Sequence, residues 1–420
     1  MKKGRNILLF LLAVSLLAVF AGCGKKPDTD EHGKGAENDN IQHTIGVAVY
    51  NQENAEMRMF MNYYKNYITQ GFPVKFYFSE KLDSGQAEEE FIHEMKEKGA
   101  EGIISFYAQD LQGAVAACEE EELYYIAGSG TVSDEDFQAV KDNSWFLGTI
   151  GPNPEAEEEA GNNMAAYAQV NGAKSYLILS GGSYIDNFMH SSRTRGMLET
   201  LGTLEQLTYS KSVEEILASS ENEILDTGNS DISVTVVPGF ISSEEGEANL
   251  KAALEKGPYD AVLSSYGMNG LVDLINDGEK SWGQNTIVGM IDCFSEENFQ
   301  AVKEDDGFGN PKFDYMEGKY ASMIGPAFAA MYNAVTGHED MIRPEGEAFR
   351  LYQSFWKTAG REEFAEMYGY TQGIYENAYS SADLMKVSAE FTPDVDWEAF
   401  KSLTEASDLE SVKERILHQN

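Results

Sequence analysis

The chain has 420 residues, of which 70 are Asp or Glu and 31 are Lys or Arg, so its formal net charge at pH 7 is −39. Because binding to nucleic acid depends on clusters of basic side chains, this excess of acidic residues argues against a nucleic-acid partner. The 22 Tyr, 22 Phe and 4 Trp residues supply large apolar side chains for packed cores, so the composition is not that of a disordered acidic chain.

The first 23 residues have the features of an export signal with a lipidation site. Three basic residues among the first five precede an apolar run from Ile7 to Phe20, which is shorter than the roughly 20 residues that a membrane-spanning helix needs. Two small residues then precede Cys23, an arrangement that resembles the bacterial lipobox. We therefore expect residues 1–22 to be a cleaved signal peptide. Cys23 is expected to carry a diacylglycerol and a fatty acid such as palmitate, which anchor the protein to the outer face of the cell membrane.

Residues 23–43 are predicted to form a flexible, lipid-linked stalk. Most of this stretch consists of Lys, Gly, Asp, Glu and Asn, and such a composition buries too little apolar surface to offset the entropy lost on ordering. The rest of the chain is longer than a single hydrophobic core usually organises, so we expect two lobes. The two further cysteines, Cys118 and Cys293, are expected to be buried thiols, and the sequence leaves their redox state open.

Short apolar runs alternate with amphipathic helical stretches from Thr44 onward. After Ser84, for example, Phe91, Ile92 and Met95 recur on one helical face. The apolar runs lack polar alternation and are therefore typical of strands covered on both faces, and their alternation with helices favours a parallel sheet. The predicted strands of this first set are 45–50, 74–78, 102–107, 124–127 and 146–150.

A second set of elements of the same kind follows. Its predicted strands are 176–179, 232–237, 261–265 and 286–291, with helices at about 155–170, 189–201 and 319–335. The two prolines within 151–154 forbid a continuous helix or strand there, so the first crossing between lobes is predicted in this segment. We therefore predict an α/β fold with two Rossmann-like lobes, each with a parallel sheet, joined by a hinge.

The first lobe is predicted to comprise 44–150 plus about 322–340. The second is predicted to comprise 151–321 plus about 341–420, where an aromatic-rich extension lies. The roles of this extension and of the polar stretch 202–230 stay open.

Ligands of open parallel sheets bind outside the carboxyl ends of the strands. The loops at these ends are rich in amides, hydroxyls, carboxylates and tyrosines, a mixture that suits a neutral, hydroxyl-rich ligand. The same residue types also cap helices and form turns. The candidate ligand-binding residues selected in this way are Asn51, Gln52, Tyr107, Gln109, Ser129, Tyr184, Asp186, Asn187, Tyr266 and Asn269.

Six segments in a characteristic order give the chain a likeness to a known family over about residues 44 to 337. They are Ile45–Tyr50, Gly102–Ile104, Gly148–Ile150, Tyr176–Gly181, Arg193–Gly196 and Gly289–Asp292. In these segments the chain resembles the type I periplasmic substrate-binding proteins of ABC transporters, in particular the ribose- and galactose-binding branch. The resemblance implies that Arg193 and Asp292 contact the ligand.

The chain departs from this family at two loops. Gly128-Ser129-Gly130 stands where the sugar binders commonly have an Asp-Arg pair, so the usual sugar clamp is incomplete. Tyr266-Gly267 stands where an Asn-Asp pair is frequent, so a stacked ring is expected to replace a hydrogen bond there.

The resemblance implies an extracytoplasmic solute-binding lipoprotein of an ABC importer, which captures a small polar ligand, most readily a sugar, and delivers it to a membrane permease. A nucleoside-binding importer component and a sensor lipoprotein that presents its ligand to a receptor kinase or chemoreceptor remain open. An enzyme is disfavoured, because the sequence lacks a Gly-x-Ser-x-Gly elbow, a His-Glu-x-x-His zinc motif and a phosphate-binding loop. We therefore expect no catalytic residue, cofactor or metal.

Overall fold

The computed structural model describes residues 42–417, apart from residues 186, 241–242, 269 and 372–376. Residues Ile41–Asn420 form one compact unit. The predicted signal peptide, the predicted lipidation site Cys23 and nearly all of the predicted stalk lie outside the described residues. Within the described part of the chain, no helix combines the length and apolar character needed to cross a membrane.

A six-stranded, fully parallel sheet with the helices packed on it forms the first lobe. Its strand order is β12-β5-β4-β3-β1-β2. The strands are β1 (His43–Ala48), β2 (Val74–Phe78), β3 (Gly102–Ser105), β4 (Tyr124–Gly128), β5 (Phe146–Pro152) and β12 (Phe349–Gln353). The helical elements are α1 (Ala55–Asn62), η1 (Tyr63–Ile68), α2 (Thr69–Gly71), α3 (Gly85–Glu97), α4 (Leu111–Glu120), α5 (Asp134–Val140), η3 (Ala321–Ile324), α12 (Gly325–Val335), α13 (Glu339–Ile342) and η4 (Pro344–Gly346).

A seven-stranded sheet forms the second lobe, with the order β13-β11-β10-β9-β6-β8-β7. Its strands are parallel except the two edge strands, β13 and β7, which pair antiparallel with their neighbours. The strands are β6 (Ser175–Gly181), β7 (Glu223–Leu225), β8 (Ser233–Pro238), β9 (Ala261–Ser264), β10 (Ile287–Cys293), β11 (Tyr315–Lys319) and β13 (Trp356–Ala359). The helical elements are α6 (Pro154–Val170), η2 (Ser183–Ile185), α7 (Phe188–Leu204), α8 (Val213–Leu217), α9 (Glu244–Leu254), α10 (Val272–Trp282), α11 (Glu296–Lys303) and α14 (Gly360–Gly369).

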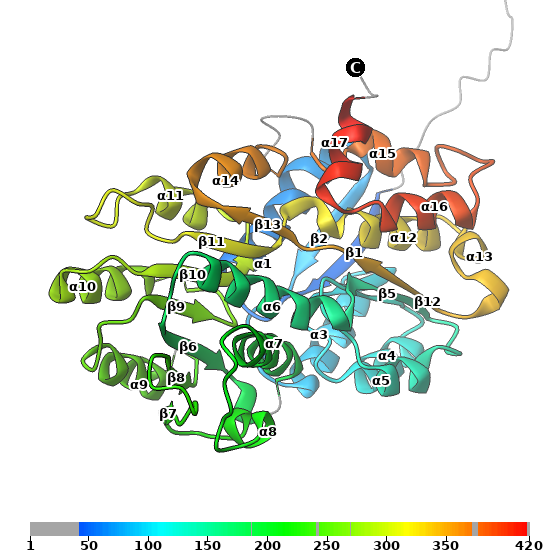
Figure 1. Cartoon of the computed structure of the whole chain (residues 1–420). Coiled ribbons are helices and arrows are strands. Elements are labelled where there is room, and N and C mark those ends of the chain that lie inside the picture. Colours follow the sequence, from blue (N-terminus) through cyan, green and yellow to red (C-terminus); the bar gives the residue numbers. More distant parts are fainter. Residues whose placement is uncertain (1–41, 186, 241–242, 269, 372–376, 418–420) are drawn as a thin grey trace, which may run out of the picture. The chain divides into compact units, whose positions relative to one another are not determined.

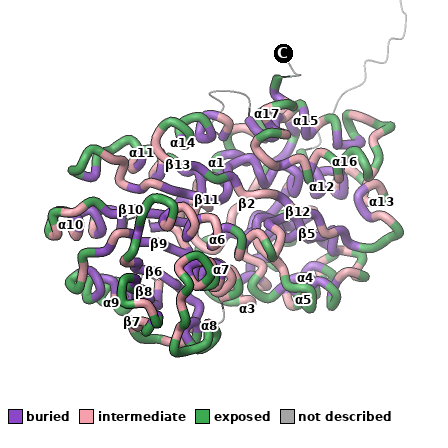
Figure 2. Tube along the Cα trace, in the orientation of Figure 1, coloured by how far each residue is buried: buried purple, intermediate pink, exposed green. Residues whose placement is uncertain are grey.

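The two sheets confirm the predicted fold class of two parallel-sheet α/β lobes. Central strands such as β3, β5 and β9 are buried along their whole length, as expected for strands covered by helices on both faces. In Figure 2 the tube is largely purple along β5 and β9, and green exposed stretches lie mainly on the outer helices and loops.

The chain connects the two sheets three times. It passes from β5 to α6 at Asn153, from β11 to η3 at Tyr320, and from β12 to β13 through Ser354 and Phe355 (Figure 1). The predicted helix 319–335 is wrong at its start, because Tyr315–Lys319 pairs with β10 and β13 as a strand and the α-helix begins only at Gly325.

The assignment of all of 341–420 to the second lobe is also wrong for one strand. Residues Phe349–Gln353 pair in parallel with β5 and extend the sheet of the first lobe. The strand carries alternating buried side chains, of which Phe349 packs on Trp397 and Phe400. The remaining lobe boundaries stay predictions.

The described part of the aromatic-rich extension ends with three helices: α15 (Ser381–Lys386), α16 (Trp397–Glu405) and α17 (Leu409–Leu417). Of these, α15 and α16 contact α12, and α16 also packs on β12. Phe349 of β12, for example, lies 5.5 Å from the ring of Trp397 of α16. Part of the extension therefore covers the first lobe.

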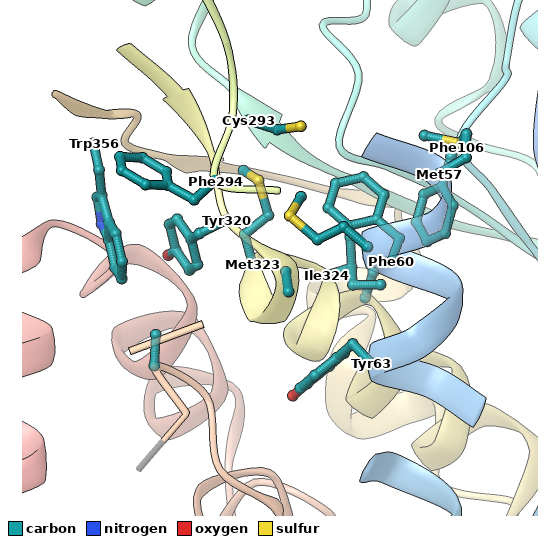
Figure 3. Packing of buried hydrophobic residues seen from close by; sticks show 14 of the residues in the cluster. Met57, Phe60, Tyr63, Phe106, Cys293, Phe294, Tyr320, Met323, Ile324 and Trp356 are labelled. Atoms are coloured by element: carbon teal, nitrogen blue, oxygen red, sulfur yellow. The ribbon is translucent and has the colours of Figure 1, made fainter. Parts of the chain in front are cut away.

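The largest hydrophobic core cluster contains side chains of both lobes. Figure 3 shows Phe294, which follows β10, grouped with Tyr320 and Trp356 at the crossings, and Met323 and Ile324 between this group and Phe60 of α1. The rings of Tyr320 and Trp356 stack at 3.9 Å, so two of the three connections contact each other directly. Cys118 and Cys293 are both buried and free, as the sequence predicts.

Candidate ligand-binding site

Asn side chains start three of the helices that face the strand ends. Asn54 caps α1, Asn153 caps α6 and Asn187 caps α7, in each case by accepting hydrogen bonds from backbone N–H groups of the first turn. Each of these helices carries a charged side chain within its first two turns: Glu56 in α1, Glu157 in α6 and Arg193 in α7. These three residues define the centre of the candidate site.

Arg193 forms a buried ion pair with Glu157. Its Nε donates to Oε2 of Glu157 at 2.5 Å, and its Nη1 donates to the carbonyl oxygen of Ser265 at 2.9 Å. Both side chains are almost fully buried, with 8 % and 0 % of their surfaces exposed. The attraction between the two charges and their hydrogen bonds offset the free energy that is needed to remove both groups from water. Among the residues that the structure describes, Nη2 of Arg193 has no hydrogen-bond partner.

Two glycines bring these side chains together. A Cβ atom on Gly161 of α6 would lie 2.0 Å from the carbonyl oxygen of Arg193, and one on Gly196 of α7 would lie 2.2 Å from that of Glu158. Since such distances are far below contact, only glycine permits α6 and α7 to cross this closely. The predicted importance of the Arg193–Gly196 segment therefore has a packing reason in addition to its charge.

A residue of the first lobe also reaches Glu157. Thr131 follows β4, and its Oγ1 donates to Oε1 of Glu157 at 3.0 Å. One carboxylate thus holds a hydroxyl of the first lobe on one oxygen and the guanidinium of the second lobe on the other.

Asp292 lies in β10, one residue before its end, close to Arg193 and Glu56. Burial, with a smaller contribution of the Glu56 carboxylate, raises the pKa of its carboxyl group to about 6, against the lowering effects of Asn298 and Arg193. Nδ2 of Asn298 donates to Oδ2 of Asp292 at 2.7 Å. Gly267 packs directly against this carboxylate, because a Cβ atom there would lie 2.4 Å from its Cγ. The loop after β9 therefore covers Asp292 only because Gly follows Tyr266.

A second ion pair joins the lobes beside Asp292. Nζ of Lys319, at the end of β11, lies 3.0 Å from Oε1 of Glu56, and the two side chains are 9 % and 18 % exposed. Burial raises the pKa of the Tyr50 hydroxyl well above its ordinary value, and Glu56, Cys293 and Asp292 add to this effect. Tyr50 of the first lobe therefore lies close to Asp292 of the second.

Three rings form an apolar wall at the strand ends of the second lobe. The His190 ring lies 5.5 Å from Tyr266 and 5.1 Å from Phe240, and the latter two are 6.2 Å apart. Nδ1 of His190 accepts a hydrogen bond from the backbone N–H of Gly182 at 3.0 Å. Burial, with a smaller effect of Arg193, lowers the pKa of His190 to about 3, so this ring is neutral at physiological pH. The wall offers faces for ring packing and no positive charge.

Two serine hydroxyls at the strand ends are buried without a partner. Ser129 follows β4 and Ser265 follows β9, and neither Oγ has a hydrogen-bond partner among the described residues. Ser129 adopts a φ of 68°, a conformation that is uncommon for a residue with a side chain. Buried hydroxyls of this kind have unused capacity to donate to and accept from a ligand.

Most of the other candidates from the sequence form hydrogen bonds within their own loops or cap a helix, and two lie outside the described residues. Asn51 accepts from the backbone of Glu53, Gln52 donates to the carbonyl oxygen of Ser79, and the hydroxyl of Tyr107 donates to Gln109. Tyr184 lies half-buried in η2, and Asn187 caps α7. Asp186 and Asn269 are not described. None of these observations tests ligand contact, so all twelve candidates stay predictions.

The candidates from the sequence do not include two residues of this centre, Glu56 and Glu157, or their partners Lys319 and Thr131. A carboxylate in the first turn of a helix is ordinarily a solvated residue that favours the helix dipole, so the sequence carries no signal that Glu56 and Glu157 are buried. Within the described residues, no group of three or more His, Cys, Asp or Glu side chains is arranged to hold a metal ion.

A small crevice lies between α1 and α11, at the edge of the two lobes. It has a volume of about 80 Å³ and is lined by Ala55, Arg58, Met59, Asn62, Ser295, Glu296 and Glu297. Arg58 and Glu297 form an ion pair across it. Because pockets for small molecules usually measure about 300 Å³ or more, this crevice is not the candidate site.

Comparison with solved structures identifies the fold. The chain is similar to an ABC transporter solute-binding protein from Bacillus halodurans with bound myo-inositol, with a TM-score of 0.56 and 14 % identity over 79 % of this chain and 99 % of that one. It is also similar to a periplasmic sugar-binding protein from Pseudomonas fluorescens, with a TM-score of 0.57 and 12 % identity over 88 % and 99 %. A third similar structure is an ABC transporter solute-binding protein from Actinobacillus succinogenes with bound D-allose, with a TM-score of 0.55 and 12 % identity over 77 % and 99 %.

No family model matches the chain, and no curated protein matches it. The fold is that of the type I periplasmic binding proteins, with two parallel-sheet α/β lobes. At these levels of identity the likeness establishes the fold alone.

Proposed function

We propose that this protein is the sugar-binding component of an ABC importer, anchored outside the cell membrane through a lipid on Cys23. One observation carries the proposal: the buried guanidinium of Arg193 has no partner for its Nη2 among the described residues, and it donates to Ser265, whose own buried hydroxyl also has no partner there. This donor and acceptor set suits a ligand that presents several hydroxyl groups.

The charge balance of the site supports a neutral ligand. Arg193 is paired with Glu157, and Lys319 is paired with Glu56. Asp292 has an amide partner, Asn298, and no cation at salt-bridge distance among the described residues. Since both cations are already neutralised, a phosphorylated or acidic sugar would find no unpaired positive charge and would face the Asp292 carboxylate.

The proposed mechanism is capture by closure of the two lobes. Ligand bound between the strand ends stabilises the closed state relative to the open one, and the closed protein then docks on the permease. Several hydrogen bonds and packing on the wall of Tyr266, His190 and Phe240 are sufficient for a micromolar dissociation constant, which corresponds to about −8 kcal/mol. Three proteins of similar fold support the choice of a sugar or polyol: a solute-binding protein with bound myo-inositol, a periplasmic sugar-binding protein, and a solute-binding protein with bound D-allose.

A thermal-shift screen tests the proposal. The segment 41–420, which forms one compact unit, is heated in the presence of myo-inositol, D-galactose, D-allose, L-arabinose, adenosine and L-leucine. A ligand at 100 times its dissociation constant adds about 2.7 kcal/mol to stability, which is a readily measured shift. We expect a shift with at least one neutral sugar or polyol and none with its phosphorylated form. A shift with adenosine or leucine alone would contradict the proposal, as would the absence of any shift at millimolar sugar.

The lipid anchor has a separate test. Cells that express the full chain are fractionated, and the protein is followed with an antibody. We expect the wild type in the membrane fraction and the Cys23→Ser variant outside it or still carrying its signal peptide. Equal membrane association of a processed Cys23→Ser variant would contradict the assignment of Cys23.

A further inference from the structure

A shared carboxylate links the proposed ligand-binding arginine to the opposite lobe. Glu157 is fully buried, accepts from Thr131 of the first lobe on Oε1, and accepts from Arg193 of the second lobe on Oε2. We propose that Glu157 is a positioning residue that couples closure of the lobes to the orientation of Arg193. This inference rests on the proposed function of Arg193 as a ligand contact.

The position of Glu157 in the chain suits this role. It lies one turn after Asn153, the cap of α6 and the point where the chain first crosses between the lobes. Rotation of the lobes about this connection changes the distance between the loop after β4 and the start of α6. On this proposal the Thr131 bond forms in the closed arrangement and breaks when the lobes separate.

Arg193 is held from three directions, and each restricts a different part of its side chain. Glu157 holds Nε, the carbonyl oxygen of Ser265 holds Nη1, and the guanidinium lies 5.9 Å from the ring centre of Phe355. Phe355 belongs to the third connection between the lobes. Because only Nη2 remains unpaired among the described residues, the contacts leave one edge of the guanidinium for the ligand.

The hydroxyl of Thr131 is the specific element of this link. When the Thr131 hydroxyl moves away, the buried Oε1 of Glu157 loses its hydrogen bond. The Glu157 carboxylate is then held by the guanidinium of Arg193 alone. The charge-assisted bond between Thr131 and Glu157 thus favours the closed arrangement. Two ion pairs between the lobes, Arg58–Glu297 and Lys319–Glu56, do not involve Arg193.

The experiment compares Thr131→Val, which removes the hydroxyl at nearly constant shape, with Thr131→Ser, which retains it. The interlobe distance is measured in ligand-free 41–420 by pulsed electron paramagnetic resonance between spin labels on Glu120→Cys and Lys256→Cys. Both positions are exposed, whereas the native thiols Cys118 and Cys293 are buried. Arg58→Ala, which breaks the more exposed ion pair between the lobes, is the matched control.

We expect Thr131→Val to shift the distance distribution toward the open form and Thr131→Ser to restore the wild-type distribution. With myo-inositol or whichever sugar of the screen binds, we expect the dissociation constant of Thr131→Val to rise about tenfold and that of Arg58→Ala to change less. The combination of Thr131→Val with Glu157→Gln should cost less than the sum of the single changes, because Thr131→Val removes a hydrogen bond that Glu157→Gln has already weakened by removing the charge of its acceptor.

Two outcomes separate this inference from the proposed function. If no sugar binds but Thr131→Val still opens the ligand-free protein and Thr131→Ser does not, the proposed function fails and the link between Thr131 and Glu157 stands. If the distance distributions of Thr131→Val and wild type coincide, or if the two changes are additive in sugar affinity, the inference is overturned even where a sugar binds.

Discussion

The indole Nε1 of Trp356 donates a hydrogen bond to the carbonyl oxygen of Ser407 at 2.9 Å, and the hydroxyl of Tyr320 donates to the same oxygen at 3.1 Å. Oγ of Ser407 in turn accepts from the backbone N–H of Ser354 at 2.8 Å. Tyr320, Ser354 and Trp356 lie at the second and third connections between the lobes, whereas Ser407 lies between α16 and α17. The C-terminal extension therefore binds the connections that join the lobes.

We predict that Trp356→Phe lowers the free energy of unfolding by about 1 to 2 kcal/mol. The variant keeps an aromatic ring against Tyr320 but loses the donor to Ser407, and a lost buried hydrogen bond has an effect of this size. Urea unfolding followed by circular dichroism measures the change. Trp145→Phe, which alters a half-buried indole away from the connections, is the control. Equal effects of the two variants would contradict a special role for the bond to Ser407.

We predict that Asp292→Asn is more stable than the wild type above pH 6. Burial raises the pKa of Asp292 in the folded protein to about 6, so the folded state holds this proton more tightly than the unfolded chain does. The resulting cost in stability is absent below about pH 4, grows as the pH rises, and is complete above pH 6. The amide cannot ionise and avoids this cost, which amounts to about 1 to 3 kcal/mol.

The stability difference between Asp292→Asn and wild type is measured by urea unfolding at several pH values. Other buried carboxyl groups with a raised pKa, such as that of Glu88, contribute equally to the pH dependence of both proteins, so their contribution cancels in the difference. Asp277→Asn, at an exposed position, provides the control. A difference that does not change between pH 4 and pH 7 would contradict the burial of a charged Asp292.

We predict that Gly267→Ala disrupts the candidate site. The added Cβ would lie 2.4 to 2.6 Å from the carboxylate atoms of Asp292, so the loop or the carboxylate must move, at a cost of about 1 to 3 kcal/mol. We expect a lower melting temperature and at least about tenfold weaker binding of any sugar that the screen finds. In Gly202→Ala the nearest atom lies at 3.7 Å, so this control should be neutral or slightly stabilising within its helix. Unchanged affinity in Gly267→Ala would remove Asp292 from the site.

We predict that Arg193→Ala lowers the free energy of unfolding by about 3 kcal/mol or more, because it leaves the buried carboxylate of Glu157 without its cation. Adding Glu157→Gln should recover part of this loss, since a neutral amide is less costly to bury. Chemical denaturation measures both effects. Arg195 lies in α7 like Arg193, and Arg195→Ala removes an ion pair with the exposed Glu214 of α8. This variant should lower the free energy of unfolding by less than about 1 kcal/mol. If Arg193→Ala and Arg195→Ala are equally stable, the ion pair is not buried in solution.

The sequence predicts the central strands of both sheets correctly, because strands buried on both faces are short apolar runs. It misses β11, whose residues include Glu317 and Lys319. In the structure the hydroxyl of Tyr315 donates to Glu317 at 2.7 Å, and Lys319 pairs with Glu56. These partners neutralise or satisfy charges that in the sequence look incompatible with a buried strand.

The candidate site, like the strands, has some residues that the sequence predicts and some that it does not. Arg193, Asp292 and Tyr266 follow from the resemblance and from their places at strand ends, and the structure brings them close to one another. Glu157, Thr131, Glu56 and Lys319 have no local signal, since their partners are between 26 and 263 positions away in the chain.

Local patterns of apolar and polar residues determined the central strands, the amphipathic helices between them and the two-lobed α/β class, because backbone conformation and amphipathic spacing depend on neighbours in the chain. Tertiary structure alone decided that β12 joins the first sheet, that Ser407 binds two connections, and that Glu157 joins Thr131 to Arg193. The reason is that hydrogen bonds and ion pairs act over a few ångströms in space, and only the folded chain brings such distant residues within that range.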